Sequence, residues 1–387
     1  MPALLTLFSV GVVLRPQIVG IGPLLPRIES SLGISHTVAG LLSTIPVLCM
    51  GVFAPLAPSL LSRFGSRNAI GFSLGAVGLV GVARALTPGA APVLALTVPI
   101  GIGIAVAGTL LPVVVKDEHA ERVAIGTGAY TAGINVGATI ASVVAVPLAL
   151  LWSWRLALFV FSAAALVVTI GWAARRHRTP RLVVRAPLPL RSRAAWKLAA
   201  VFGLQSSLFY GLNAWLPETY VDRGWSQAAG GELIALLNGV GLVVGFLTAL
   251  ANQRGGSRRV YICAGAAAAT GGTALVATNT PSAWAWAVLL GAATGVLFTT
   301  VMTLPLDVSS APSEIAATTA LMLGVGYTVS ALAPTVLGAL RDATGSFVAP
   351  FAVLASIGAL LLALGTRTHT LGDVHAGSAT FVRGGAG

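Results

Sequence analysis

The sequence predicts an all-α membrane protein with twelve transmembrane helices arranged as two six-helix pseudo-repeats. Three observations predict this class: an apolar composition, long apolar segments and an internal repeat. Of the 387 residues, 56% are hydrophobic and only 9% are charged, whereas soluble domains carry about 25% charged residues. A hydrocarbon core about 30 Å thick takes roughly 20 apolar residues as a helix, which leaves room for about twelve crossings. The apolar segments do not alternate as barrel strands do, so we expect a helix bundle.

Twelve apolar segments are expected to span the membrane. They are 3–27, 37–61, 69–87, 91–115, 122–148, 154–174, 195–219, 227–252, 260–278, 283–306, 315–340 and 347–366. The first is too long for a signal-peptide core and lacks a small-residue cleavage site, so we interpret it as a transmembrane helix. A polar segment rich in Arg and Pro follows the sixth. The predicted organisation is an N-terminal half over 1–174, a cytoplasmic linker over 175–194, a C-terminal half over 195–366 and a cytoplasmic tail over 367–387.

An internal repeat relates the two halves at a constant offset of 191 residues. The repeated residues of the first copy are Gly20, Leu25, Pro26, Gly33, Ser35, Gly40, Arg63, Gly65, Ser66 and Arg67. Their counterparts are Gly211, Leu216, Pro217, Gly224, Ser226, Gly231, Arg254, Gly256, Ser257 and Arg258. Chance similarity between apolar segments does not explain why the loop SRFGSRN aligns with QRGGSRR. Parallel six-helix repeats place a substrate near the middle of the membrane, between two halves that rock about it.

Basic residues are distributed unevenly over the predicted loops. With the N-terminus in the cytoplasm, 17 of the 23 Lys and Arg residues lie on the inner side, and Arg15 lies within the first helix. The outer side holds Arg27, Arg84, Arg155, Arg223 and Arg341. This asymmetry predicts that both termini are cytoplasmic. The net charge of +12 does not indicate a nucleic-acid partner, because the basic residues occupy short loops without interleaved aromatic residues.

Cysteine and histidine residues form no recognisable site in the sequence. Cys49 and Cys263 fall inside predicted spans, so no disulfide framework is expected. The five histidines, among them His36 at the outer end of the second helix, lack metal-ligand spacing. We therefore predict neither a metal nor another cofactor. A membrane-embedded enzyme is also not expected, because no buried nucleophile–base pair is evident.

Arg15, in GVVLRPQIVG near the middle of the first helix, is the most informative polar residue. A guanidinium at the bilayer centre costs between about 3 and more than 10 kcal/mol unless it is hydrated or paired. No Asp or Glu occurs at a comparable depth in any predicted span. We expect Arg15 to bind an anionic or acceptor-rich substrate through its planar guanidinium. The alternative is a structural bond to the carbonyl of Val12, which Pro16 leaves without its usual partner.

Polar residues on later helices are further candidates for a central site. The fifth helix has a stripe made of Thr127, Thr131, Asn135 and Thr139. The threonines are equally compatible with bonds to their own backbone, whereas the amide of Asn135 needs external partners. Asn135 and Tyr130 cannot face the same direction, because five residues advance about 500° around a helix. The sequence is compatible with either of the two side chains facing the central site.

The seventh helix is the counterpart of the first, so its polar face is expected to oppose Arg15. This face and two weaker single candidates comprise Gln205, Ser206, Tyr210, Asn213, Asn238 and Tyr327. The alternative is interhelical hydrogen bonding that stabilises the bundle, at about 0.6 kcal/mol for each bond.

Pairs of glycines at four-residue spacing occur on two helices. Gly133 and Gly137 lie on the fifth helix, and Gly241 and Gly245 lie on the eighth. Such pairs allow close helix approach. We expect these helices to meet across the two halves, where the glycines would form sliding surfaces. Static packing is an equally supported alternative.

The loop after the second helix resembles a motif of the major facilitator superfamily. That motif has Gly, Asp, Arg, Gly and two basic residues; Arg63, Gly65 and Arg67 match it, while Ser62 stands at the acidic position. The fragments LRPQIVGIGPLLPRI, GLLSTIPVLCMGVFAPLAP, FGLQSSLFYGLNAWLPETY and GYTVSALAPTVLGALRDATGS are similar to the cyanate and nitroimidazole permease branch. The resemblance covers about Leu4 to Leu364. It implies the two-half major facilitator fold and a small polar or anionic substrate.

Together these features predict secondary or facilitative transport of a small anion or compact polar solute by alternating access. A drug–proton antiporter is the alternative, although no buried acid for proton coupling is evident. A sensor is less favoured, because no segment is long enough for an added soluble domain. The expected location is the bacterial inner membrane. The expected partners are the substrate and lipid, with the coupling ion open and a proton as one candidate, and the chain is expected to be a monomer.

Reporter fusions test the predicted orientation. A reporter that works only in the cytoplasm should be active when it is joined at Arg185 or after Gly377, because the basic residues of the predicted loops favour the inner side. Activity of a periplasm-only reporter at either point would contradict the orientation. A fusion at Gly89, in a predicted outer loop, is the matched control and should show the opposite result.

Overall fold

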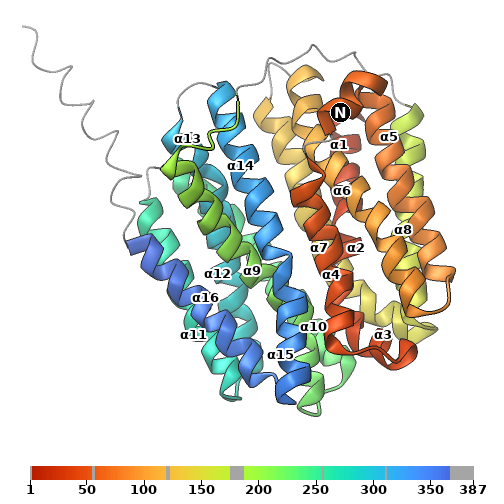
Figure 1. The fold of residues 1–387 in the computed structure, drawn as a ribbon, viewed down its shortest axis with the longest axis vertical. Helices are drawn as coiled ribbons and strands as arrows, with labels where there is room; N and C mark the ends of the chain where they lie inside the picture. The colour runs from red at the N-terminus through yellow and green to blue at the C-terminus, as the bar shows by residue number, and fades with distance from the viewer. Residues whose placement is uncertain are drawn as a thin grey trace, which may run out of the picture.

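The structure, a computed structural model, describes residues 2–54, 57–118, 123–174, 187–254, 257–309 and 312–366. Within these ranges the regular elements are all helices, and Figure 1 shows them as a bundle of long, roughly parallel helices. Ten are long and apolar enough to cross a membrane, and one shorter apolar helix accompanies them. The predicted all-α membrane class is confirmed. The predicted linker is described only from residue 187 onward, and the predicted tail lies outside the described ranges.

The helices fall into two groups along the chain. The N-terminal half contains α1 (Pro2–Leu14), α2 (Pro16–Val19), the 3-10 helix η1 (Gly22–Leu24), α3 (Leu25–Leu32), α4 (His36–Val52), α5 (Ala57–Leu86), α6 (Ala90–Glu118), α7 (Val123–Leu151) and α8 (Trp154–Ala174). The C-terminal half contains α9 (Arg193–Asp222), α10 (Gln227–Gln253), α11 (Arg258–Ala277), α12 (Ala283–Thr303), α13 (Pro305–Val308), α14 (Pro312–Ser330), α15 (Leu332–Thr344) and α16 (Val348–Thr366).

The first predicted span is not one helix. It is divided into α1, α2, η1 and α3, and it continues to Leu32 rather than ending at residue 27. Pro16, Pro23 and Pro26 lie at or next to the first positions of the successive pieces. Proline has no amide hydrogen and cannot continue an intrahelical hydrogen-bond ladder. The break after Leu14 therefore lies at Arg15, whose carbonyl accepts from the two amides at the start of the next turn.

The second predicted span, 37–61, also differs from the structure. α4 ends at Val52, and residues from 57 onward begin α5, which continues through Gly65 with φ 73° and ψ 166°. This backbone conformation favours glycine because a side chain is strained there. The neighbouring Arg67 donates to the carbonyl of Ala173 at 2.5 Å, while Arg63 is exposed. Of the loop-motif residues, Arg67 thus joins α5 to the end of α8.

The repeated residues have the same local structure in both halves. Gly33 and Gly224, which follow α3 and α9, both have positive φ. Two residues later, Ser35 accepts a hydrogen bond at the start of α4, and Ser226 accepts one at the start of α10. A side-chain oxygen at this position satisfies a backbone amide that has no intrahelical partner. The repeated sequence positions therefore form the same helix-end structures in both halves.

Three pairs of helices form the main contact between the halves. α4 packs against α14 and α15, and α7 packs against α10. At these contacts Gly40 lies against the carbonyl of Pro334, and its repeat counterpart Gly231 lies against the side chain of Val146. The Thr44 hydroxyl donates to the Ala331 carbonyl at 2.6 Å. The predicted meeting of the fifth and eighth helices is therefore present.

The paired glycines do not lie at that contact, which corrects our expectation of a sliding surface. A Cβ atom at Gly133 would meet the backbone of Phe8, and one at Gly137 would meet that of Val12, so both pack on α1 within the N-terminal half. Gly241 and Gly245 face Gly291 and Gly295 of α12 within the C-terminal half. The glycines permit close approach inside each half. The residues that join α7 to α10 lie farther along α7.

Substitution at Gly137 should destabilise the N-terminal half. Gly137→Ala would place its Cβ 2.8 Å from Val12 backbone atoms, an overpacked contact that costs about 1–3 kcal/mol. Gly128→Ala on the same helix is the control, since nothing lies within 4 Å of its Cβ position and alanine gains about 0.5–1 kcal/mol in a helix. Thermal unfolding in detergent measures both variants. An equal melting temperature for the two would contradict this packing.

Candidate functional site

Arg15 connects the two halves at the break in the first span. Its guanidinium donates a hydrogen bond to the Tyr210 hydroxyl of α9 at 2.7 Å. Arg15 is half-buried, whereas Tyr210 is buried. The expected opposition of Arg15 and the polar face of the seventh helix is thus present in the structure, through Tyr210. This contact goes to a neutral phenol rather than to the Val12 carbonyl considered above.

A second tyrosine completes the surroundings of the guanidinium. Tyr327 of α14 lies within electrostatic and hydrogen-bonding reach of Arg15, and its ring centroid is 6.4 Å from that of Tyr210. The Tyr327 ring packs edge-on against Phe202 at 5.0 Å. Such packing holds the aromatic rings in fixed positions. The guanidinium has five N–H donors and a full charge, and the tyrosine hydroxyls supply acceptors without neutralising that charge.

Tyr130 and Asn135 occupy different surroundings on α7. Tyr130 packs against the apolar cluster that also includes Tyr210, and it is an electrostatic neighbour of Tyr327. Asn135 is half-buried, and its backbone carbonyl accepts from the Thr139 hydroxyl at 3.1 Å. The structure therefore places Tyr130 with the tyrosines around Arg15. Asn135 stays a predicted substrate contact.

Four other predicted site residues form two buried pairs. Gln205 donates to the Ser206 hydroxyl at 2.7 Å, and its side-chain oxygen has no hydrogen-bond partner among the described residues. Asn238 donates to the side-chain oxygen of Asn213 at 2.8 Å and to the Ser142 hydroxyl at 2.9 Å. The second group joins α10 and α9 to α7 across the halves. These hydrogen bonds link helices to one another. They agree with the alternative interpretation of this polar face, in which interhelical hydrogen bonds stabilise the bundle.

Arg84, which we count on the outer side from the sequence, is buried inside the N-terminal half. It is 0% exposed and donates to Gln17 at 2.5 Å and to Thr97 at 3.1 Å. Gln17 in turn donates to the Ser162 hydroxyl at 2.9 Å. This network joins α2, α5, α6 and α8 inside the N-terminal half. This network could not be predicted, because Arg84 lies near a predicted helix end and its partners are distant in the sequence.

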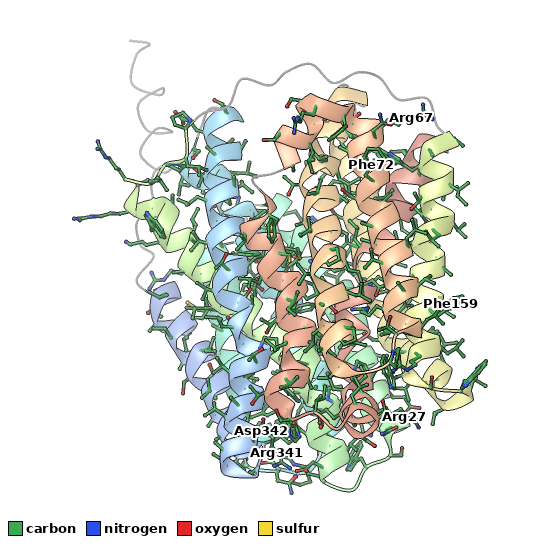
Figure 2. All side chains as sticks on the ribbon, turned by 45° about the vertical axis from the view of Figure 1, so that its right-hand side comes forward. Arg27, Arg67, Phe72, Phe159, Arg341 and Asp342 are labelled. Atoms are coloured by element: carbon green, nitrogen blue, oxygen red, sulfur yellow. The ribbon has the colours of Figure 1, made fainter. Side chains whose placement is uncertain are left out.

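Charged residues gather at the end of the bundle that carries α3, which we call the α3 end. Figure 2 shows Arg27, Arg341 and Asp342 there, with Arg67 at the opposite end. Sequence reasoning gave these residues no role beyond loop charge. Asp222 and Arg341 form an ion pair at 2.8 Å within the C-terminal half. Other contacts at this end cross between the halves.

Asp342 of α15 caps the first turn of α4 from the other half. Its carboxylate accepts from the backbone amides of His36 and Thr37 at 3.2 and 2.8 Å, and from the Thr37 hydroxyl at 2.5 Å. The first amides of a helix have no intrahelical partners and carry partial positive charge, so a carboxylate is favourable there. The cap is formed only while the halves are in contact at this end.

Two further cross-half contacts are counterparts in the repeat. His36 Nε2 lies 3.3 Å from a Glu218 carboxylate oxygen, and Arg27 donates to Gln227. At the offset of 191, Arg27 corresponds to Glu218 and His36 corresponds to Gln227. The same pair of positions therefore joins the halves twice, once in each direction. The sequence contains these corresponding positions, but identical residues do not reveal them, because the residues at each pair of positions differ.

Membrane-length helices in two contacting groups, with a guanidinium held between them, define a polytopic membrane protein with a central polar site. The sequence profile described as Major Facilitator Superfamily matches residues 7–334. The chain belongs to the major facilitator superfamily and is a membrane transporter of that class.

Three curated relatives match nearly the whole chain. The uncharacterized transporter YycB of Bacillus subtilis (strain 168) is 31% identical over 349 residues, covering 88% of this chain and 87% of YycB. The cyanate transport protein CynX of Escherichia coli (strain K12) is 28% identical, covering 93% of this chain and 96% of CynX. The 2-nitroimidazole transporter of the same organism is 28% identical, covering 93% of each chain. The resemblance to this branch is confirmed.

Solved structures show the same fold. The crystal structure of a D-xylose–proton symporter matches with a TM-score of 0.77, covering 96% of this chain and 97% of that chain at 14% identity. At this identity the likeness concerns the fold alone. It confirms the predicted major facilitator fold with its two six-helix pseudo-repeats.

Removing the charge of the cap should loosen the α3 end. Asp342→Asn should cost the closed contact about 0.3–1 kcal/mol, the value of a negative charge at a helix N-terminus, which is roughly a 2- to 5-fold shift. The measurement is the labelling rate of a Thr44→Cys probe, buried between α4 and α15, by an impermeant maleimide added on the α3 side. Faster labelling is expected.

The labelling experiment needs a background without other thiols and a control carboxylate. Cys49 and Cys263 are replaced by alanine and serine, respectively. Glu232→Gln removes an exposed carboxylate of α10 and should leave the labelling rate unchanged. Equal rates for Asp342→Asn and Glu232→Gln would show that the cap does not hold this end closed.

Proposed function

We propose that the transporter carries a small anion or compact, acceptor-rich polar solute, which binds between the halves at Arg15. The observation that carries the proposal is a guanidinium at mid-span whose described partners are tyrosine hydroxyls. A charge at this depth costs between about 3 and more than 10 kcal/mol without hydration or pairing. An anion or a strongly accepting planar group would pair with it through charge-assisted, two-pronged hydrogen bonds.

The tyrosines add selectivity to the proposed site. Tyr210 and Tyr327 present hydroxyl groups beside Arg15, and their rings are tilted by 57° to each other, so each ring offers a separate apolar face. A small planar solute would stack on one of the rings and bond at its edge to the hydroxyls and the guanidinium. Tyr130 borders the same group, and Asn135 is proposed to add an amide from α7. A bulky apolar drug would leave the guanidinium without a partner.

The names of the relatives agree with this chemistry. One relative is named for cyanate, a small linear anion, and another for 2-nitroimidazole, a compact planar ring with accepting nitro oxygens. Both solutes combine small size with acceptors that suit a guanidinium. We propose that the solute of the present chain shares these properties, and we assign neither compound to it.

Transport is proposed to proceed by alternating access of the Arg15 site. The described polar contacts between the halves extend from the Arg15–Tyr210 bond to the α3 end. We assign this arrangement to a state closed at the α3 end, which the charge asymmetry of the loops places outside the cell. Opening this end requires that the cap of α4 and the two counterpart contacts break. Equivalent contacts between the halves at the opposite end of the bundle would then close that end.

Substitution of Arg15 tests the proposed site. Arg15→Gln should weaken binding of cyanate or 2-nitroimidazole by roughly ten- to a hundredfold, because it removes a charge-assisted bond worth about 1.5–3 kcal/mol. Arg15→Lys keeps the charge but loses the planar fork, so its affinity should lie between the two. Binding is measured on purified protein by calorimetry, together with the melting temperature.

The melting temperature separates a binding role from a structural one. The empty Arg15→Gln protein should be no less stable than the wild type, since a costly buried cation is gone. Normal binding combined with a much lower melting temperature would make Arg15 a structural residue and would refute the site. Uptake of both solutes into proteoliposomes then tests whether binding leads to transport.

A further inference from the structure

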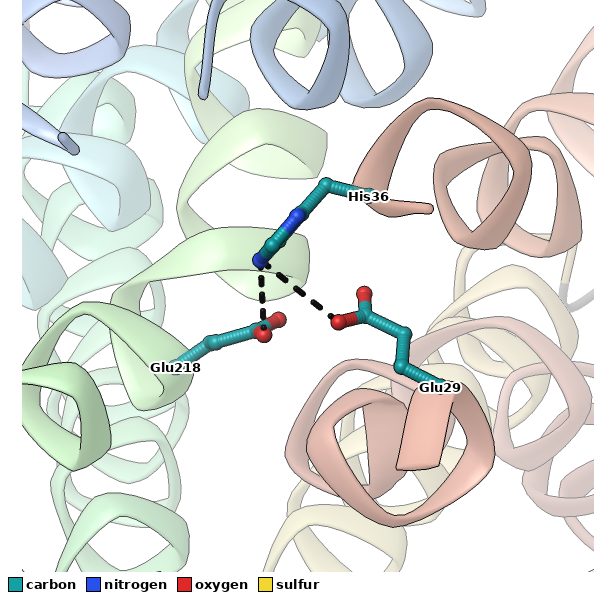
Figure 3. A group of neighbouring side chains, drawn as sticks. All are labelled: Glu29, His36 and Glu218. Carbon is teal, nitrogen blue, oxygen red and sulfur yellow. Dashed lines mark ion pairs between the residues drawn. The ribbon is translucent and has the colours of Figure 1, made fainter. Parts of the chain in front are cut away.

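We propose that Glu29, His36 and Glu218 form a binding site for one divalent metal ion of the zinc class, which joins the two halves at the α3 end. Figure 3 shows the three side chains converging from α3, the start of α4 and α9. One ligand atom from each lies within 4.8 Å of the other two. The site uses no residue of the proposed substrate site, and it does not depend on which solute is carried.

The two distances from His36 Nε2 to the carboxylates fit tetrahedral coordination. Zinc binds histidine nitrogen at about 2.0–2.1 Å and carboxylate oxygen at about 2.0–2.2 Å. Two ligand atoms of such a tetrahedron are therefore about 3.3–3.6 Å apart. His36 Nε2 lies 3.6 Å from Glu29 Oε2 and 3.3 Å from Glu218 Oε1. An ion placed between the three atoms requires only a small movement of the carboxylates.

The histidine is oriented as metal-binding histidines are. His36 Nδ1 lies 2.8 Å from the Asp342 carboxylate, which can accept a hydrogen bond from a protonated Nδ1. With the proton on Nδ1, Nε2 could offer its lone pair to an ion held between the two glutamates. A carboxylate behind a ligating histidine fixes its tautomer and ring orientation in many metal sites. Asp342 is thus a positioning residue for the proposed site.

Both glutamates contain an oxygen that lacks a partner. Glu218 is 6% exposed, and its Oε2, like Glu29 Oε1, is buried without a hydrogen-bond partner among the described residues. Two buried carboxylates side by side repel each other, so a cation between them is strongly favoured. The nearby Arg341 is already paired with Asp222 and lies over the Phe347 ring. Without an ion, a protonated His36 can face both carboxylates as their cation, and a bound divalent ion would take over that role.

Aromatic rings close one side of the cluster. Trp215 and Phe347 lie 5.8 and 5.9 Å from the His36 ring, and they contact each other at 5.9 Å. With three protein ligands, a tetrahedral ion keeps its fourth position for water. Softer divalent ions that accept imidazole, such as zinc, are favoured over calcium or magnesium, which prefer more oxygen ligands.

A bound ion would stabilise one state of the transporter. Glu29 and His36 belong to the N-terminal half, and Glu218 belongs to the C-terminal half. The complete ligand set exists only while the α3 end is closed. A ligand that binds one state raises the population of that state by mass action. Extracellular zinc would then slow opening at the α3 end.

The test measures zinc binding to untagged full-length protein by calorimetry. The chain holds four other histidines, His119, His177, His369 and His375, so the result is read as a difference between variants. Glu29→Gln and Glu218→Gln should each lose one equivalent of zinc, and His36→Gln should lose the same equivalent. His177→Gln is the matched control and should retain it.

Two further readouts distinguish a bridging site from surface binding. Zinc should raise the melting temperature of the wild type, but not that of Glu29→Gln or Glu218→Gln, which alter one half each without changing side-chain shape. Asp342→Asn should weaken zinc binding by about 10- to 100-fold without abolishing it, as expected for the partner of a ligating histidine. Cobalt added in place of zinc should give the visible absorption of a tetrahedral ion.

The proposal is overturned if the wild type and Glu218→Gln bind the same number of zinc ions. It is also overturned if zinc leaves the wild-type melting temperature unchanged, since the cluster would then balance its charge with protons alone. Either result leaves the proposed substrate site untouched, because that site is tested through Arg15.

Discussion

Polar groups placed within a bilayer need partners inside the protein, and this chain finds several of them across the boundary between its halves. Arg15 reaches Tyr210, Asn238 joins Asn213 to Ser142, and the first amides of α4 reach Asp342. The first two sets of bonds satisfy groups that hydrocarbon cannot solvate, and the third satisfies backbone amides at a helix end. Each also fixes the position of one half relative to the other. Stability and conformational state are therefore controlled by the same bonds, and a change of state must provide water or a solute as the replacement partner.

The break in the first span shows how the chain exposes a charge without losing a helix. Pro16 ends the ladder after α1, so Arg15 lies at a joint instead of on a continuous surface. The carbonyl of Val12, freed by the proline, lies against Gly137, where a side chain would collide with it. The two residues therefore act together. The proline leaves the Val12 carbonyl without its usual amide partner, and the glycine lets α7 approach that carbonyl. A guanidinium at a joint can turn toward a solute while the helices on either side stay packed.

The class, the helix count and the repeat could be predicted because they depend on composition and periodicity, which a single sequence contains. The opposition of Arg15 and Tyr210 also followed, since the repeat identifies the helices that face each other. The glycine pairs were assigned to the wrong contact, because spacing shows that a helix packs closely but not which neighbour it packs on. The cluster of Glu29, His36 and Glu218 was missed for a related reason. Its members are separated by up to 189 residues, and each alone resembles an ordinary residue at a helix end.

The counterpart contacts Arg27–Gln227 and Glu218–His36 bear on how such a protein can originate and be rebuilt. If the repeat arose by gene duplication, the ancestor was a half-length chain that paired with a second copy of itself. Two present-day N-terminal halves would set Arg27 against His36 twice, and two C-terminal halves would set Glu218 against Gln227 twice. Neither homodimer reproduces the complementary charges of the full-length chain. At this contact, each half of the full-length chain therefore supplies the partner of a residue in the other half.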